Sequence, residues 1–272
     1  MNHSRSLAYA LAASAGAILL ALSLALAEPK STFEPQVGQE GKDVIWVPTA
    51  QALVERMLDM ARVGPGDIVY DLGSGDGRTV IAAAKRGATA FGVEFNPDMV
   101  SLSRENAKKA GVADRTTFIQ GDLFAADISK ATVITLFLLP SLNVKLRPKL
   151  LDLRPGTRVV SNSFDMGDWR PDRTDEAVDD CSTYCRAHLW IVPAKVEGTW
   201  QLPNGELRLN QTYQWFDGEL RQGSTTMAIS DGKLAGDQIS FVAGDTRYTG
   251  RVSGNAMEGL ALSSTGWRVT RN

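Results

Sequence analysis

Histidine and surplus positive charge are both nearly missing from this sequence. His3 and His188 are the only histidines among the 272 residues, so histidine-rich metal sites and Ser-His-Asp triads are excluded. Lysine and arginine number 29 against 31 aspartates and glutamates, a formal net charge of −2. This balance provides no basic field to attract phosphates, and we expect no nucleic-acid partner.

Cysteine is also scarce, with only Cys181 and Cys185. Two cysteines with no histidine pair nearby are poor zinc ligands, so no metal site is expected. In an oxidising compartment the two would close a short disulfide, whereas in the cytosol they would stay free thiols. The choice between these states depends on where the protein resides.

An uncharged apolar segment fills residues 7–27 and is preceded by Arg5. It ends in Ala-Leu-Ala, a small-residue pattern typical of signal-peptide cleavage, yet it is long enough to span a bilayer as a helix. We therefore expect residues 1–27 to be a signal peptide or membrane anchor. Arg5 favours an exported, periplasmic orientation and hence the disulfide. Lys30 beyond the run, and the cytosolic origin of the cofactor inferred below, keep anchoring at the cytoplasmic face open.

Residues 28–43 are polar and predict a linker, and residues 44–194 then alternate between strand and helix periodicity. Strands are expected at residues 67–73, 89–95, 116–122, 131–139, 157–164 and 187–194, and helices at 78–86, 98–111 and 142–153. Continuous apolar strands alternating with helices predict an α/β fold with a doubly wound, mostly parallel sheet.

Residues 195–272 follow a different pattern, with short alternating stretches and turn dipeptides at 204–205, 217–218, 231–232 and 254–255. This pattern predicts a small all-β antiparallel barrel or sandwich. Its aromatic residues are interpreted as core, so we expect this domain to contribute no cofactor contacts.

The stretch YDLGSGDGR follows the first expected strand, with glycines at Gly73, Gly75 and Gly77. Ligands of doubly wound sheets bind at such a turn. Dinucleotide sites have the spacing G-x-G-x-x-G, but Arg78 stands where the third glycine would be, and Asp71 would repel a pyrophosphate. S-adenosylmethionine reverses this argument because it carries a sulfonium and an ammonium and no phosphate. The glycines would let the backbone approach its methionine portion.

Acidic residues end the next two expected strands as well. Glu94 has the spacing of an acid that holds both ribose hydroxyls, and Asp122 could accept from an adenine amino group, with Leu123 and Phe124 flanking the ring. Each acid could instead be an ordinary helix N-cap. Together with Asp71 and the glycines, they favour a site for S-adenosylmethionine.

Six motifs carry a family resemblance: WVPT, YDLGSGDGR, GVEFNP, GDLF, FLLPSLNVKLRPKL and RVVSNSFDMGDW. With them, residues 44–194 resemble class I S-adenosylmethionine-dependent methyltransferases, and within these the ATP-synthase c-subunit and adenine-nucleotide-translocase lysine methyltransferase family. The resemblance implies an enzyme that methylates an accessible protein lysine, in or near a membrane. It also implies that the segment before the first strand closes over the cofactor, which implicates Pro48 and Thr49.

The acceptor site is less marked in the sequence. FLLPSLN stands where adenine-N6 methyltransferases carry Asn/Asp-Pro-Pro-Tyr, which argues against a DNA adenine substrate. Near the end of the strand at 157–164, Asn162, Asp165 and Trp169 are the catalytic candidates, because they could orient an amine and stack its alkyl stem. Trp169 could equally be core and Asp165 a turn cap. A small-molecule methyltransferase and a non-catalytic exported binding or scaffold protein remain the alternative functions.

Overall fold

The computed structural model describes residues 33–177, 180–261 and 266–271. The apolar segment at 7–27 lies outside the described residues, so its predicted role stays a prediction. Within the described ranges, no helix is long and apolar enough to cross a membrane.

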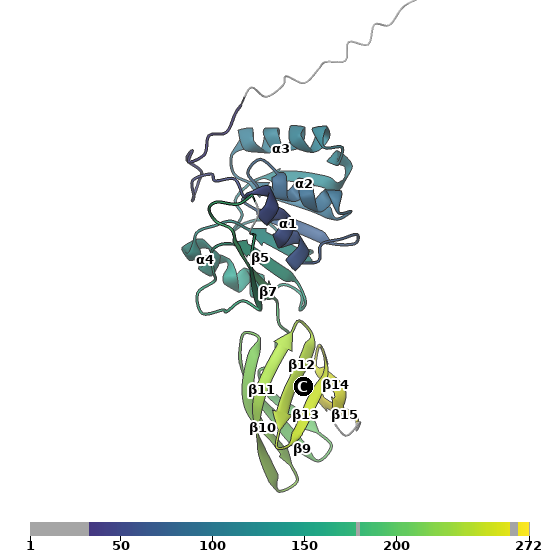
Figure 1. Ribbon diagram of the computed structural model, residues 1–272. Helices are drawn as coiled ribbons and strands as arrows, with labels where there is room; N and C mark the ends of the chain where they lie inside the picture. Colours follow the sequence, from purple (N-terminus) through teal and green to yellow (C-terminus); the bar gives the residue numbers. More distant parts are fainter. Residues whose placement is uncertain (1–32, 178–179, 262–265, 272) are drawn as a thin grey trace, which may run out of the picture. The chain divides into compact units, whose positions relative to one another are not determined.

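The first half of the described chain forms a seven-stranded sheet in the order β3-β2-β1-β4-β5-β7-β6 (Figure 1). The five strands from β3 to β5 pair in parallel, whereas β7 runs antiparallel to β5, and β6 antiparallel to β7. The strands are β1 (Ile68–Leu72), β2 (Thr89–Glu94), β3 (Thr116–Gln120), β4 (Val133–Leu136), β5 (Arg158–Asn162), β6 (Arg173–Glu176) and β7 (Arg186–Ile191). The predicted doubly wound, mostly parallel sheet is thus confirmed.

Helices cover both faces of this sheet, which explains why its strands are apolar throughout. On β1, Val69 belongs to one buried cluster and its neighbour Tyr70 to the other, because successive side chains point to opposite faces. The first cluster includes buried residues of α1 (Gln51–Met60), α2 (Arg78–Lys85) and α3 (Pro97–Lys109), and the second those of α4 (Pro140–Leu151). Figure 1 shows α4 apart from the other three helices.

The helix ends follow local chemistry. At the start of α3, the Asn96 side chain accepts from the backbone N–H groups of Asp98 at 2.8 Å and Met99 at 3.3 Å. The helix predicted at 142–153 begins two residues earlier, at Pro140, because proline suits a first helical position. It contains Pro148, as expected.

Two elements carry no prediction from the sequence. The helix α1 places Leu53, Val54, Met57 and Leu58 in the core along one apolar stripe. The strand β6 has the sequence RTDE and forms the outer edge of the sheet, so it shows no apolar pattern that could mark it.

The second half of the described chain forms a closed antiparallel barrel, in the order β10-β11-β12-β13-β14-β15-β8-β9. Its strands are β8 (Gly198–Leu202), β9 (Gly205–Thr212), β10 (Trp215–Gln222), β11 (Thr225–Ala235), β12 (Gln238–Ala243), β13 (Thr246–Ser253), β14 (Ala256–Ala261) and β15 (Gly266–Thr270). Buried side chains, among them Trp200 and Phe241, fill it. The structure therefore selects the barrel from the two predicted all-β forms.

Two of the four predicted turns in this region are wrong. Residues 204–205 and 254–255 lie at strand junctions, but 217–218 lie inside β10 and 231–232 inside β11. Both pairs lie at shifts in strand register, and Gly218 and Asp231 have positive φ angles of 148° and 51°. Bulges of this kind bend and twist a strand, as the closing of a small barrel requires.

Candidate active site

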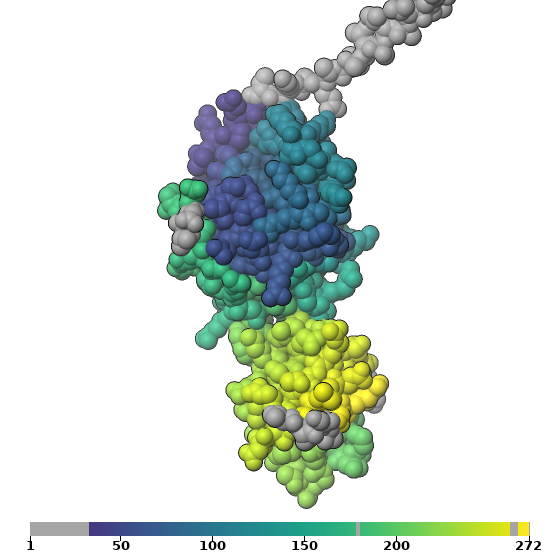
Figure 2. Space-filling model, turned by 45° about the vertical axis from the view of Figure 1, so that its right-hand side comes forward, coloured from purple at the N-terminus to yellow at the C-terminus, as the bar shows by residue number. Residues whose placement is uncertain are grey.

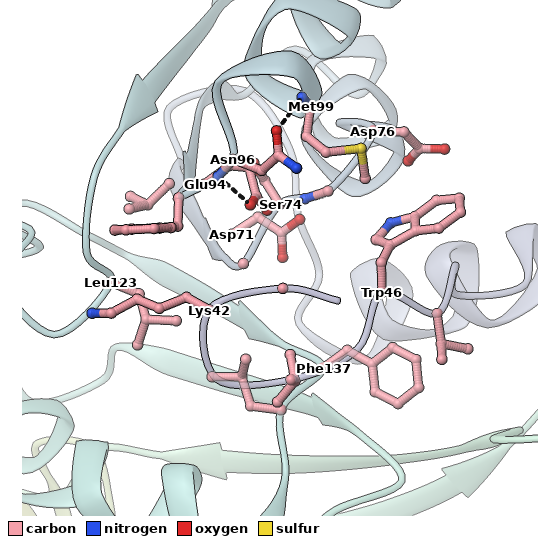
Figure 3. Close-up of a pocket in the computed structure, with 18 of the residues that line it drawn as sticks. Lys42, Trp46, Asp71, Ser74, Asp76, Glu94, Asn96, Met99, Leu123 and Phe137 are labelled. Atoms are coloured by element: carbon pink, nitrogen blue, oxygen red, sulfur yellow. Dashed lines mark hydrogen bonds between the residues drawn. The ribbon is translucent and has the colours of Figure 1, made fainter. Parts of the chain in front are cut away.

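A pocket opens at the carboxyl ends of β1 to β4, where the strand order reverses between β1 and β4 (Figure 3). One side is formed by these strand ends and the other by residues 39–49, which precede α1. Figure 2 shows this purple segment lying against the sheet domain. Eight of the predicted cofactor-binding residues line the pocket: Pro48, Thr49, Asp71, Gly73, Gly75, Glu94, Asp122 and Leu123.

The three glycines of the turn have positive φ angles, of 85° at Gly73, 52° at Gly75 and 81° at Gly77. A Cβ on Gly75 would lie 2.6 Å from the indole Nε1 of Trp46, so the bare backbone lets Trp46 pack on the turn. Gly77 is not among the lining residues. A Cβ there would lie 2.9 Å from the Phe118 ring, so this glycine permits close packing between helix and sheet.

Glu94, at the end of β2, is held in a fixed orientation by the backbone. Its Oε2 accepts from the Gly75 N–H and its Oε1 from the Asn96 N–H, both at 2.9 Å. Each carboxylate oxygen can accept more than one hydrogen bond. The side chain can therefore take a pair of ligand hydroxyls without losing its support.

Asp71, near the end of β1, is buried, with 7% of its surface exposed. Thr135 donates its hydroxyl to Oδ1 at 2.7 Å. Burial raises the pKa of Asp71 to about 7, against the lowering effect of the Thr135 hydrogen bond, and the charges of Asp76 and Glu94 raise it further. This carboxylate lacks a cationic partner, which fits a ligand that brings its own positive charge.

Asp122, beyond the end of β3, already has two partners. Lys42 donates to its Oδ2 at 2.6 Å, and the Phe124 N–H donates to its Oδ1 at 2.8 Å. The Lys42 hydrogen bond lowers the pKa of Asp122. Lys42 also lies over the Phe95 ring, 5.1 Å from its centroid, so this contact ties the segment 39–49 to the far side of the pocket. The turn role considered for Asp122 is therefore present, beside its place in the pocket wall.

The pocket fits S-adenosylmethionine in charge and in shape. Glu94 and Asp71 provide acceptors at neighbouring strand ends, and the backbone at Gly73 and Gly75 is open to close approach. In addition, Ser74 Oγ is buried in the wall without a hydrogen-bond partner in the structure. Such an atom calls for a ligand or water group to satisfy it.

The three catalytic candidates do not lie together. Asn162 is fully buried behind the pocket wall, where its Nδ2 donates to Thr49 Oγ1 at 3.2 Å and its Oδ1 has no partner. Asp165 is exposed, and its Oδ1 accepts from the Gly167 N–H at 3.1 Å, as a turn cap would. None of the three is among the residues that line the pocket.

Trp169 is fully buried in the second core cluster of the sheet domain. Its Nε1 donates to Gln214 Oε1 at 2.9 Å, and Gln214 Nε2 donates to the Arg170 carbonyl at 2.8 Å. The ring stacks on Tyr213, with centroids 6.0 Å apart. These contacts correspond to the core interpretation of Trp169.

Several lining residues were not singled out from the sequence, among them Lys42, Trp46, Asn96, Met99 and Phe137. Trp46 and Phe137 lie within the quoted motifs WVPT and FLLPSLNVKLRPKL, which is the signal that could have marked them. Lys42 lies in the expected linker and carries no such signal. Among the described residues, every one lining this pocket precedes Leu139, so the barrel contributes none, as expected.

The strand order, the antiparallel β7 and the acids around the glycine turn together define an S-adenosylmethionine-dependent methyltransferase. A solved structure with the same fold, described as an RNA methyltransferase from Salinibacter ruber in complex with S-adenosyl-L-homocysteine, is 54% identical with a TM-score of 0.52. The similarity covers 55% of this chain and 96% of that one. The enzyme and cofactor predicted from the sequence are thereby confirmed, and the scaffold alternative is wrong.

Residues 71–173 match the family described as the ANTKMT methyltransferase domain, and the chain belongs to this family. A protein-lysine N-methyltransferase of Saccharolobus islandicus (strain REY15A) is 43% identical over 152 residues, which are 55% of this chain and 94% of that protein. A lysine N-methyltransferase of the ATP-synthase c-subunit from Xenopus laevis is 40% identical over 141 residues. That match covers 51% of this chain and 62% of the relative, so the chain spans about three fifths of it.

Proposed function

We propose that this enzyme methylates the side-chain amine of a protein lysine. The observation that carries the proposal is the apolar segment after β4: Phe137 and Leu138 line the pocket beside Asp71, where DNA adenine methyltransferases have polar residues. The names of the two relatives, both lysine methyltransferases, support the same acceptor.

The bound cofactor supplies an electrophilic methyl group on sulfur and leaves as a neutral thioether, so no acid is needed. The tasks of the chain are alignment and supply of an uncharged amine. A free lysine has a pKa near 10.4, and an apolar wall such as that of Phe137 and Leu138 favours the neutral form by desolvation. The amine loses its proton to water before the transfer.

Asn162 and Thr49 are the polar groups we assign to orient the amine. Thr49 lines the pocket, and the Asn162 oxygen behind it is buried without a hydrogen-bond partner in the structure. An amine N–H donated to the Thr49 hydroxyl or to this oxygen would direct the nitrogen lone pair toward the methyl group. This assignment keeps Asn162 from the three candidates and gives it a role through Thr49.

The experiment that tests the acceptor is transfer from S-adenosylmethionine with a tritiated methyl group into extracts of the source organism. Acid hydrolysis and amino-acid analysis that find methylated lysine support the proposal. Label removed by ribonuclease would favour RNA as the acceptor, the substrate class named for the Salinibacter ruber protein. Label that passes a small-molecule filter would favour the small-molecule alternative. A Glu94→Ala variant run in parallel shows the background.

We also propose that residues 1–27 place the enzyme at a membrane and that its protein substrate is membrane-associated. The uncharged run at 7–27 and the membrane-protein substrate in the Xenopus laevis relative's name support this proposal. Methylated lysine recovered from the soluble fraction alone would contradict it.

The periplasmic orientation is tested by a phosphatase fused after Asn272, because this reporter is active only outside the cytoplasm. An active fusion supports the outward face. A silent but stably expressed fusion would leave an enzyme anchored at the cytoplasmic face.

A further inference from the structure

Three aromatic rings meet at the sheet edge next to the pocket. The rings of Phe137 and Phe164 stack with centroids 6.1 Å apart, and Tyr184 lies 5.3 Å from Phe137 and 5.8 Å from Phe164. Phe137 is one of the pocket-lining residues. Phe164 is half-buried and Tyr184 is 45% exposed, so the cluster leads from the pocket wall to the surface.

The strand order places this cluster on the acceptor side of the pocket. Phe137 follows β4, Phe164 lies two residues beyond β5, and Tyr184 lies just before β7. Since β7 is antiparallel to β5, its beginning lies at the same edge as the ends of β4 and β5. The cofactor acids lie on β1, β2 and beyond β3, on the other side of the reversal in strand order. An acceptor must therefore enter from the side of β4, β5 and β7.

The backbone around the cluster is held in an unusual conformation. Ser163 and Tyr184 have positive φ angles of 58° and 56°, which non-glycine residues rarely adopt. The Ser163 N–H donates to the Arg186 carbonyl at 2.7 Å, which joins the two loops that carry Phe164 and Tyr184. Strained backbone of this kind persists when the surrounding structure requires it, and it is common at functional sites.

A disulfide closes the short loop that carries Tyr184. Cys181 and Cys185 are bonded in the structure, the state predicted for an oxidising compartment, and enclose residues 182–184. The Tyr184 ring has no covering layer on its exposed side, so its position depends on this loop and on the two phenylalanine rings.

We infer that Phe137, Phe164 and Tyr184 form the wall that receives the acceptor lysine's side chain, and that the Cys181–Cys185 disulfide holds Tyr184 in it. The inference rests on the proposed lysine acceptor. The alkyl stem packs on the ring faces, and the ammonium, before it loses its proton, is attracted by the same faces. The wall positions the acceptor and takes no part in cofactor binding.

A binding experiment on the full chain in detergent tests this wall without measuring activity. The probe is an S-adenosylhomocysteine analogue in which nitrogen replaces sulfur and carries an alkyl amine of lysine length. Calorimetry gives the affinity gain of the probe over S-adenosylhomocysteine. We expect a gain of about tenfold or more in the parent protein, since burying a few methylene groups is worth this much.

Phe164→Ala and Tyr184→Ala should each reduce the gain by about fivefold, with S-adenosylhomocysteine binding unchanged. Tyr184→Phe should preserve it, because the ring and not the hydroxyl packs on the stem. Leu260→Ala, which removes an exposed apolar side chain of the barrel, is the matched control. Treating the parent protein with dithiothreitol, or replacing both cysteines by serine, should act like Tyr184→Ala.

The outcomes separate the two proposals. If the parent protein shows no gain, the lysine acceptor itself is wrong. A gain that survives both alanine substitutions would reject the aromatic wall and leave the lysine acceptor standing. Loss of the gain on alanine substitution but not on reduction would reject the role of the disulfide. Thermal unfolding of each variant identifies any that fail to fold, and reduction of the parent protein then supplies the measurement in their place.

Discussion

Asn162 and Thr49 are 113 positions apart in the chain and share a hydrogen bond of 3.2 Å from Nδ2 to Oγ1. Thr49 belongs to the segment that forms one side of the pocket, and Asn162 ends a central strand of the sheet. The bond therefore fixes the pre-α1 segment against the acceptor side of the sheet. Its second consequence is that the Asn162 oxygen stays without a partner in the structure.

Replacing Thr49 by valine should lower methyl transfer about tenfold and leave S-adenosylmethionine affinity within about twofold, because the change removes only the polar group facing the acceptor. Single-turnover rates and calorimetry measure the two quantities. Thr157→Val is the matched control, since its buried hydroxyl donates to the Ala131 carbonyl away from the pocket. Equal loss of rate in both variants would show that the Thr49 effect is a general loss of packing.

Replacing Glu94 by alanine should weaken S-adenosylmethionine binding by about 1.5–3 kcal/mol, the usual scale for hydrogen bonds to a charged group. The loss has two causes, because Glu94 also orders the turn through the Gly75 N–H. Glu94→Gln retains one acceptor oxygen and should lose about half as much. Glu219→Ala, an exposed acid of the barrel, should bind like the parent. Parent-like binding by Glu94→Ala would place the cofactor elsewhere.

Cofactor binding should strengthen as the pH rises toward 7. The pKa of Asp71 is about 7 in the free protein, so below this pH the side chain must lose a proton before it can accept from the ligand ammonium. Affinity should therefore rise about tenfold between about pH 5.5 and pH 7. Calorimetry over this range, in buffers of different ionisation enthalpy, also detects the released proton. In Asp71→Asn the pH dependence should vanish and binding should be weak at every pH.

The same shift predicts that Asp71→Asn stabilises the free protein. The pKa of Asp71 is raised from 3.8 to about 7 on folding, so above pH 3.8 the unfolded chain gives up a proton that the folded protein keeps. Stability is thus lost as pH rises through this window, by up to about 4 kcal/mol above pH 7. Urea unfolding at pH 8 should show the variant to be more stable, and at pH 4 the difference should disappear. A variant less stable at pH 8 would contradict the assigned pKa.

Gly77→Ala should destabilise the protein by about 1–3 kcal/mol more than Gly66→Ala. Both glycines have positive φ angles, 81° and 89°, so both variants carry the same backbone penalty. Only at Gly77 would the new Cβ meet other atoms, at 2.9 Å from the Phe118 ring and 3.0 Å from Ser103 Cβ. Urea midpoints measure the difference, and equal midpoints would show that the helix can move away at little cost.

Local patterns were enough to predict most of the sheet domain. Val69 and Tyr70 are both apolar because each face of a parallel sheet is covered, so β1 is readable as a continuous run. Glu94 and the glycines of the turn are readable because strand, turn and helix follow one another within a few residues. The polar edge strand β6 gives no such signal, and the glycines in β10 and β11 look like turns because a bulge and a turn use the same residue types.

Contacts between distant segments were decided only by the tertiary structure. The sequence alone marks Trp169 as an aromatic residue near a strand end, and only its fully buried contact with Gln214 gives it a core position. Lys42 meets Asp122, and Tyr184 meets Phe137, because strand order places their loops side by side. Periodicity describes which face of its own element a residue occupies. The neighbour across that face depends on the order of the strands, which no local pattern contains.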